Sequence, residues 1–178
     1  MRLGKPPIVD YGYEEQVLLV VPVRVANNVR VGTEAALIVH VKWLVCREIC
    51  IPEKADLALH LPVHSSAEKN LGAAQLLFAE TSNCLPKPLP DGWKIAAVSS
   101  RESFVLTLQT GARVSGASFF PIEPNQIDNS APQKVDPNDR GIRLTLVKSE
   151  QLLKPVASLK GVLVLGQGRA YLVSVPVR

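Results

Sequence analysis

Two cysteines, Cys46 and Cys50, are the residues of this chain whose type and spacing most clearly allow chemistry. A tight connection of three residues between two strands would bring their Cα atoms to about 5.5 Å, a separation that suits a disulfide. Arg47 between the two sulfurs would favour a thiolate, whereas Glu48 would oppose it. The pair therefore predicts thiol–disulfide chemistry, and the net effect of its neighbours on the thiol pKa stays open.

A disulfide across so short a loop would contribute little to stability. For a ring of about five residues, the chain-entropy estimate is roughly 2 kcal/mol, near the low end for disulfides. A short bridge at a strand end, open to another thiolate, is better suited to exchange. The alternative is a static structural disulfide, or two reduced thiols packed in a core.

The segments that flank the cysteines predict two strands. Residues 37–45 are aliphatic and β-branched, with polar residues alternating at His40 and Lys42, and residues 55–61 alternate again. The two strands would run antiparallel and would place Cys46 opposite Cys50 at the turn.

Size and composition indicate a globular protein. The chain has 178 residues, enough for one large domain or two small ones, and its 47% hydrophobic content can form a core. No apolar run is long enough to cross a bilayer. Residues 1–7 have a basic start without the apolar region of a secretory signal, so an export signal, if the protein has one, is expected upstream of this chain.

Charge gives no indication of nucleic-acid binding. The formal net charge is +4, but the twenty Lys and Arg residues are scattered singly along the chain. This distribution is typical of a solvated surface rather than of a nucleic-acid footprint.

Hydrophobic periodicity predicts an all-β fold of two sandwich-like modules joined by one helix. Residues 66–80 predict the helix, with a cap at Ser65 or Ser66, and the proline-rich residues 83–92 predict a stiff linker. The long interval from Pro121 to Arg140 predicts a surface loop. Strands are expected at 16–23, 35–45, 55–63, 93–98, 104–108, 117–120, 142–146, 161–165 and 170–175. The predicted division is a β module at 1–63, a helix and linker at 64–92, and a second module at 93–178.

Several stretches closely resemble the N-terminal periplasmic region of DsbD- and ScsB-like thiol:disulfide interchange proteins. The most specific is Trp43-Leu44-Val45-Cys46 followed by Cys50-Ile51-Pro52. Tyr11 to Leu19 and Leu57 to Val63 add to the resemblance, and Phe119-Phe120-Pro121 with residues 126–133 is similar to the second part of that region in ScsB-like members. In these proteins further strands, and in DsbD a capping loop, precede the Tyr-Gly-Tyr segment. Because only ten residues precede Tyr11 here, we expect the chain to begin inside the first module.

The resemblance implies an immunoglobulin-like β-sandwich whose catalytic pair is Cys46 and Cys50. It implies a protein-disulfide reductase module without a cofactor, located in the periplasm as a domain of an inner-membrane protein. The implied electron donors are a thioredoxin-like domain and a transmembrane domain, in the same or another protein. The implied acceptors are exported thioredoxin-fold proteins of disulfide isomerisation or cytochrome c maturation. In the family the second cysteine, here Cys50, bonds to the thioredoxin-like protein, and Cys46 would be the resolving thiol.

The histidines, Cys84 and Trp43 also allow other interpretations of the site. His40 and His60 with the two cysteines could bind zinc, but their spacing is not a familiar zinc pattern, and we predict no metal. Cys84 could be a further redox residue, although a lone cysteine near a helix end is more often a small apolar residue. Trp43 could shield the cysteines or belong to a core. No Gly-x-Ser-x-Gly motif or glycine-rich phosphate loop is present.

The non-enzymatic alternative is a periplasmic β-sandwich binding or assembly module whose disulfide is structural. A redox titration separates the two functions, because structural disulfides usually have potentials below about −300 mV.

Overall fold

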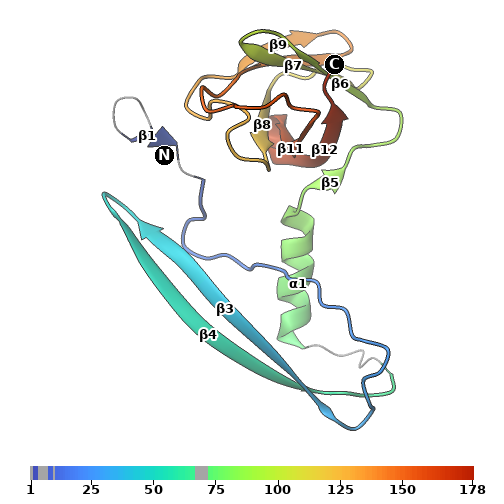
Figure 1. The fold of residues 1–178 in the computed structure, drawn as a ribbon. Coiled ribbons are helices and arrows are strands. Elements are labelled where there is room, and N and C mark those ends of the chain that lie inside the picture. Colours follow the sequence, from blue (N-terminus) through green and yellow to red (C-terminus); the bar gives the residue numbers. More distant parts are fainter. Residues whose placement is uncertain (1, 4–7, 10, 67–71) are drawn as a thin grey trace. The chain divides into compact units, whose positions relative to one another are not determined.

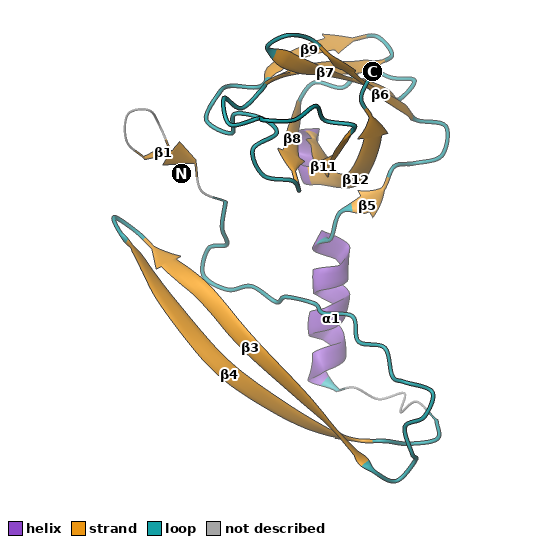
Figure 2. Cartoon of the chain, in the orientation of Figure 1, coloured by secondary structure: helices purple, strands orange, loops and turns teal. Residues whose placement is uncertain are grey.

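The computed structural model describes residues 2–3, 8–9, 11–66 and 72–178. Strands dominate it, and α1 is the one α-helix among these residues (Figure 2). The chain divides into two compact units, residues 18–80 and residues 81–178 together with 1–17. The predicted all-β fold class is confirmed, and each unit is described below by itself.

The unit that contains residues 81–178 is a β-sandwich of two four-stranded sheets (Figure 1). The first sheet is antiparallel, in the order β6-β7-β10-β9. The second has the order β5-β12-β11-β8, and only its β12–β5 pair is parallel. The strands are β5 (Lys87–Pro88), β6 (Lys94–Ser99), β7 (Ser103–Gln109), β8 (Ala117–Pro121), β9 (Lys134–Asn138), β10 (Gly141–Val147), β11 (Ser158–Leu165) and β12 (Arg169–Pro176).

Side-chain alternation builds the core of this sandwich. In β7 and β10 every second residue is buried, as expected when one face of a strand points into a core. The fully buried side chains come from both sheets, and they are mainly Leu and Phe: Phe104, Leu106, Leu108, Phe119, Ile142, Leu144, Leu146, Leu159, Leu163 and Leu165.

The end of the chain joins the two sheets. After β12, Val177 forms a parallel bridge with Ala97 of β6, and the Arg178 amide donates a hydrogen bond of 3.1 Å to the Ala97 carbonyl. The Ser99 amide in turn donates to the Arg178 carbonyl at 2.8 Å. The last residues of the chain therefore close one side of the sandwich.

The six strands predicted beyond residue 92 are confirmed within one to three residues at each end. The prediction of a plain surface loop from Pro121 to Arg140 is wrong, because this interval contains β9 and buries Gln126 and Ile127. The Gln133 side chain forms hydrogen bonds with both backbone groups of Phe119 in β8. Its Oε1 accepts from the Phe119 amide at 2.8 Å, and its Nε2 donates to the Phe119 carbonyl at 2.7 Å. A side-chain amide thus pairs with backbone groups that a neighbouring strand would otherwise satisfy.

Residues 18–80 contain one long β-hairpin (Figure 1). Strands β3 (Glu34–Cys46) and β4 (Cys50–Pro62) have thirteen residues each and pair antiparallel over their whole length, from Glu34 opposite Pro62 to Cys46 opposite Cys50. The predicted strands at 35–45 and 55–63 are both present, and each extends further toward the cysteines.

The strand predicted at Gln16–Val23 is wrong: the structure has no strand from residue 11 to residue 33. The aliphatic residues of this segment are exposed, among them Val17, Leu19 and Val21. A strand needs a neighbour to satisfy its backbone groups, and Pro22 removes one donor, so an apolar sequence alone is not sufficient. Two short strands precede it, β1 (Arg2–Leu3) and β2 (Ile8–Val9), and they pair with each other.

The predicted helix begins later and ends later than expected. Helix α1 spans Ala73–Cys84 rather than residues 66–80. Residues 67–71, near the start of the predicted helix, lie outside the described residues. The helix ends before Leu85 because a residue that precedes a proline, here Pro86, disfavours the helical conformation. In the proline-rich segment predicted to be a linker, Lys87 and Pro88 form β5 in the sandwich. No described helix is long and apolar enough to cross a membrane.

Candidate functional site

The register of the β3–β4 hairpin gives it two different faces. Because successive side chains of a strand point to opposite sides, alternate pairs of the ladder share a face. One face is apolar except for Glu53. It carries Ala35, Leu37, Val39, Val41, Trp43 and Val45 from β3, and Ile51, Glu53, Ala55, Leu57, Leu59 and Leu61 from β4.

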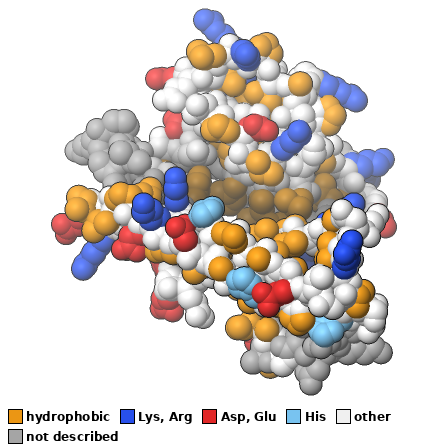
Figure 3. All heavy atoms as spheres, turned by 60° about the horizontal axis from the view of Figure 1, so that its bottom comes forward, with side chains coloured by type: hydrophobic (Ala, Val, Ile, Leu, Met, Phe, Trp, Pro, Cys, Tyr) orange, Lys and Arg blue, Asp and Glu red, His pale blue; other side chains and the backbone are white. Residues whose placement is uncertain are grey.

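The opposite face of the hairpin carries the cysteines. We call it the disulfide face, and its pairs, starting from the turn, are Cys46–Cys50, Leu44–Pro52, Lys42–Lys54, His40–Asp56, Ile38–Ala58, Ala36–His60 and Glu34–Pro62. Figure 3 views the molecule from a side on which all three kinds of ionisable side chain, basic, acidic and histidine, lie among hydrophobic ones.

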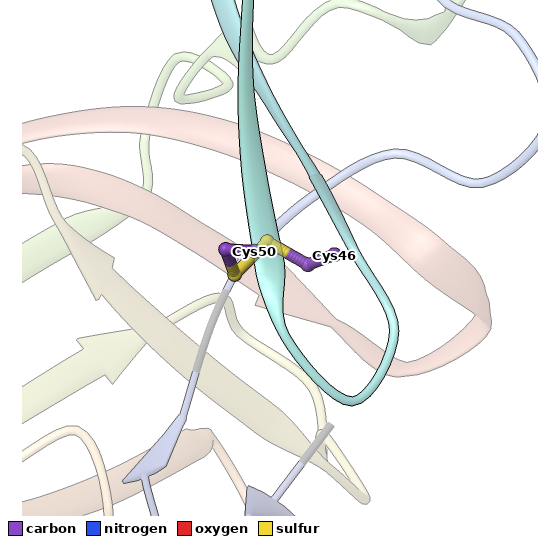
Figure 4. Close-up of a disulfide and its surroundings, with 2 residues drawn as sticks. All are labelled: Cys46 and Cys50. Atoms are coloured by element: carbon purple, nitrogen blue, oxygen red, sulfur yellow. A yellow bond between two sulfur atoms is a disulfide. The ribbon is translucent and has the colours of Figure 1, made fainter.

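Cys46 and Cys50 form a disulfide across the last pair of the ladder (Figure 4). Their Cα atoms are 4.1 Å apart, close to the narrow spacing of directly opposed residues in an antiparallel pair. Both residues are exposed, and Cys84 is a free, exposed cysteine in α1. The prediction that Cys46 bonds to Cys50, and not to Cys84, is confirmed.

A three-residue loop, Arg47 to Ile49, holds the disulfide at the tip of the hairpin. The Arg47 amide donates a hydrogen bond of 3.2 Å to the Ile49 carbonyl, which closes the loop on itself. All three side chains are exposed, and with Val45 and Ile51 of the apolar face they line a shallow depression at the tip of the hairpin. The disulfide and the loop that joins its two cysteines are therefore both exposed.

The histidines bind carboxylates rather than lying beside the cysteines. His40 Nδ1 is 2.6 Å from Asp56 Oδ1, and His60 Nδ1 is 2.7 Å from Glu34 Oε1. Among the described residues no group of three or more His, Cys, Asp or Glu could hold a metal ion. The four residues considered for zinc are thus divided between a disulfide and two separate histidine–carboxylate contacts.

Trp43 lies on the face of the hairpin opposite the disulfide. It pairs with Glu53, between the pairs that contain Lys42 and Leu44, and its side chain belongs to the apolar set. Trp43 is 40% exposed. It therefore does not shield the cysteines from their own side of the hairpin, and its sequence proximity to Cys46 reflects the strand rather than a shared surface.

Sequence reasoning missed the lysine pair of the disulfide face. Lys42 and Lys54 lie directly opposite each other, two pairs from the disulfide, and both are exposed. A shallow depression on the hairpin is lined by both lysines with Leu44 and Pro52, and also by Trp43 and Glu53 of the opposite face. Lys42 lies four residues before Cys46, and Lys54 lies four residues after Cys50. If the two predicted strands pair with the cysteines opposite each other, this equal spacing places the lysines opposite each other as well.

One comparison with known proteins gives a match that includes the hairpin. Residues 3–62 match the family model described as "Thiol:disulfide interchange protein DsbD, N-terminal". This segment, about a third of the chain, is similar to the DsbD N-terminal domain family and contains both cysteines. Comparison with the curated proteins and with the solved structures finds no match.

Proposed function

We propose that Cys46 and Cys50 are the catalytic pair of a periplasmic thiol:disulfide exchange module that reduces disulfides in exported proteins. The observation that carries this proposal is the exposed disulfide at the tip of the hairpin, inside the segment that matches the DsbD N-terminal family. In this proposal the hairpin of residues 18–63 forms the exchange module and residues 64–92 connect it to a second β module at 93–178, whose compact unit also includes residues 1–17.

The proposed reaction is two successive thiol–disulfide exchanges. A thiolate of a thioredoxin-like donor attacks Cys50 Sγ, the bond between the two sulfurs breaks, and Cys46 leaves as a thiolate that takes up a proton. The second thiol of the donor then attacks the mixed disulfide. The donor leaves oxidised, and Cys46 and Cys50 become thiols after the transfer of two electrons.

The reduced pair then passes the two electrons on. The Cys50 thiolate attacks a disulfide of an exported thioredoxin-fold protein, and Cys46 resolves the mixed disulfide, which restores the Cys46–Cys50 bond and leaves the substrate as a dithiol. A transmembrane domain of the same or another protein would recharge the donor. Disulfide isomerisation and cytochrome c maturation are the pathways in which we place the acceptors.

The geometry supports exchange better than a purely structural bridge. The disulfide joins two residues that the ladder already holds opposite each other, so it constrains few additional degrees of freedom. The chain-entropy estimate for a ring of this size is about 2 kcal/mol. Both sulfur-bearing residues are also exposed, which favours attack by an external thiolate.

A redox titration tests this proposal. The chain with Cys84→Ser is equilibrated in buffers of defined potential, and the Cys46 and Cys50 thiols are labelled and counted by mass. We expect a potential above about −300 mV, in the range of exchange catalysts, and the same value with Cys84 present. A potential well below about −300 mV would instead support the module with a structural disulfide.

A further inference from the structure

The disulfide face of the hairpin holds a pair of like charges that does not stabilise it. Lys42 and Lys54 are directly opposed in the antiparallel ladder, and like charges in this position repel each other. Both side chains are exposed, and within residues 11–66 and 72–178 neither forms an ion pair. A carboxylate at either position would replace this repulsion by a cross-strand attraction, so attraction across the ladder does not account for the lysine pair.

The surroundings leave the lysine charges available. The nearest acidic residue on the same face is Asp56, one pair further from the turn, and its carboxylate is hydrogen-bonded to His40 Nδ1 at 2.6 Å. Glu53 is a sequence neighbour of Lys54 but lies on the opposite face. The part of the disulfide face between Asp56 and the sulfurs therefore carries two positive charges and no negative one.

The distance from the lysines to the disulfide is suitable for one continuous contact. Lys42 lies four residues before Cys46, and Lys54 lies four residues after Cys50, which at about 3.3 Å per residue places both about 13 Å from the disulfide. Between them is the apolar pair Leu44–Pro52. Starting from the turn, the disulfide face thus carries the disulfide, then the apolar pair Leu44–Pro52, and then the two positive charges of Lys42 and Lys54.

We infer that Lys42 and Lys54 dock thiol-exchange proteins that carry carboxylates about 13 Å from their reactive cysteine. This inference rests on the proposed function, since it names the chemistry of the protein that reaches the same disulfide. Opposite charges on two approaching surfaces raise the rate of productive encounter, and the effect falls as salt screens them. The lysines therefore select among thiol donors by rate rather than by a change in the disulfide.

Three synthetic thiol peptides test the docking role. Each has one cysteine, and four residues away it carries two Glu, two Gln or two Lys. The peptide thiolate attacks the Cys46–Cys50 disulfide of the full chain with Cys84→Ser, and the second-order rate constant for mixed-disulfide formation is measured by acid quench and mass spectrometry. At low salt we expect the Glu peptide to react about ten-fold faster than the Gln peptide, and the Lys peptide to react more slowly. At high salt the three rates should converge.

Two double variants assign the preference to the lysine pair. Lys42→Gln with Lys54→Gln should remove most of the difference between the Glu and Gln peptides, and Lys42→Glu with Lys54→Glu should reverse it in favour of the Lys peptide. Lys94→Gln with Lys160→Gln, two exposed lysines of the sandwich, is the matched control and should keep the original preference.

The outcomes separate this inference from the proposed function. If the Gln peptide reacts but the charged peptides show no difference in rate, or if the preference survives in both double variants, the docking role is wrong while exchange stands. If no peptide forms a mixed disulfide, the proposed exchange function fails as well.

Discussion

Tyr11 lies edge-on against Phe120 of β8, with the two ring centroids 5.3 Å apart and the ring planes at 87°. Tyr11 belongs to the segment that matches the DsbD N-terminal family, whereas Phe120 belongs to the sandwich. Residues 1–17 accordingly belong to the same compact unit as residues 81–178. The beginning of the family segment thus belongs to the unit that contains the sandwich, and its cysteines belong to the unit of residues 18–80.

Removal of the Phe120 ring should change the pKa of the Tyr11 phenol. Partial burial raises the pKa of Tyr11 above its ordinary value, because the charged phenolate is less well solvated there. Phe120→Ala should lower the pKa of Tyr11 toward that value, as measured by phenolate absorbance with Tyr13→Phe and Tyr171→Phe to isolate the signal. In the parent chain, the stability that Tyr11 contributes is present below about pH 10 and is lost as pH rises through its folded pKa. An unchanged pKa in Phe120→Ala would show that the ring contact does not bury Tyr11.

Gly161 of β11 should not tolerate a side chain. A Cβ at this position would meet the Phe119 ring at 2.6 Å and would clash with the Phe120 carbonyl. We expect Gly161→Ala to lower the free energy of unfolding by about 1–3 kcal/mol, as measured by denaturant titration. Gly116→Ala is the matched control, because a Cβ added at Gly116 would have no atom within 4 Å, and this variant should change stability much less. Equal effects of the two substitutions would contradict the packing of β8 on β11.

Asp128 should make the sandwich sensitive to acid. The pKa of Asp128 is lowered by hydrogen bonds from the Ser130 hydroxyl at 2.6 Å and the Ser130 amide at 2.8 Å, with a smaller opposing effect of burial and a further contribution from the Ala131 amide. The stability that this ionised carboxylate contributes is present above its unfolded pKa, about 3.9, and is lost as pH falls through the lower folded value.

Asp128→Asn should therefore be less stable than the parent chain at neutral pH and should lose less stability on acidification. Thermal unfolding measured at several pH values checks both statements, and Glu150→Gln, which alters an exposed carboxylate in a nearby segment, is the control. Parallel pH profiles for Asp128→Asn and the parent chain would rule out the proposed role of this turn.

Local alternation was sufficient to predict most of the strands, and long-range pairing explains where it failed. The strands at 104–108 and 142–146 alternate strictly because one face of each lies in the core. Strand β9 escaped detection because Pro137, Asp136 and Asn138 are typical of loops, and its pairing with β10 is a tertiary contact. The segment at 16–23 has the opposite property, since its residues favour strands but no neighbouring strand pairs with it.

The same contrast applies to the candidate site. Cys46 and Cys50 were found from residue type and spacing, because a three-residue turn fixes their separation almost without reference to the rest of the fold. The placement of Trp43 and of the lysines required the ladder. Trp43, three residues before Cys46, lies on the face opposite the disulfide, whereas Lys42, four residues before Cys46, shares the face of the disulfide.

Covalent trapping tests the central claim, the roles of Cys46 and Cys50, most directly. With Cys46→Ser in a Cys84→Ser background, Cys50 has no resolving thiol, and we expect a stable mixed disulfide with a thioredoxin-like protein activated at its nucleophilic cysteine, read by non-reducing electrophoresis and peptide mapping. Cys50→Ser in the same background should trap much less, and the chain with both cysteines should release the complex. Equal trapping by the two single variants would contradict the assigned roles, and the absence of a mixed disulfide with either would contradict the exchange function itself.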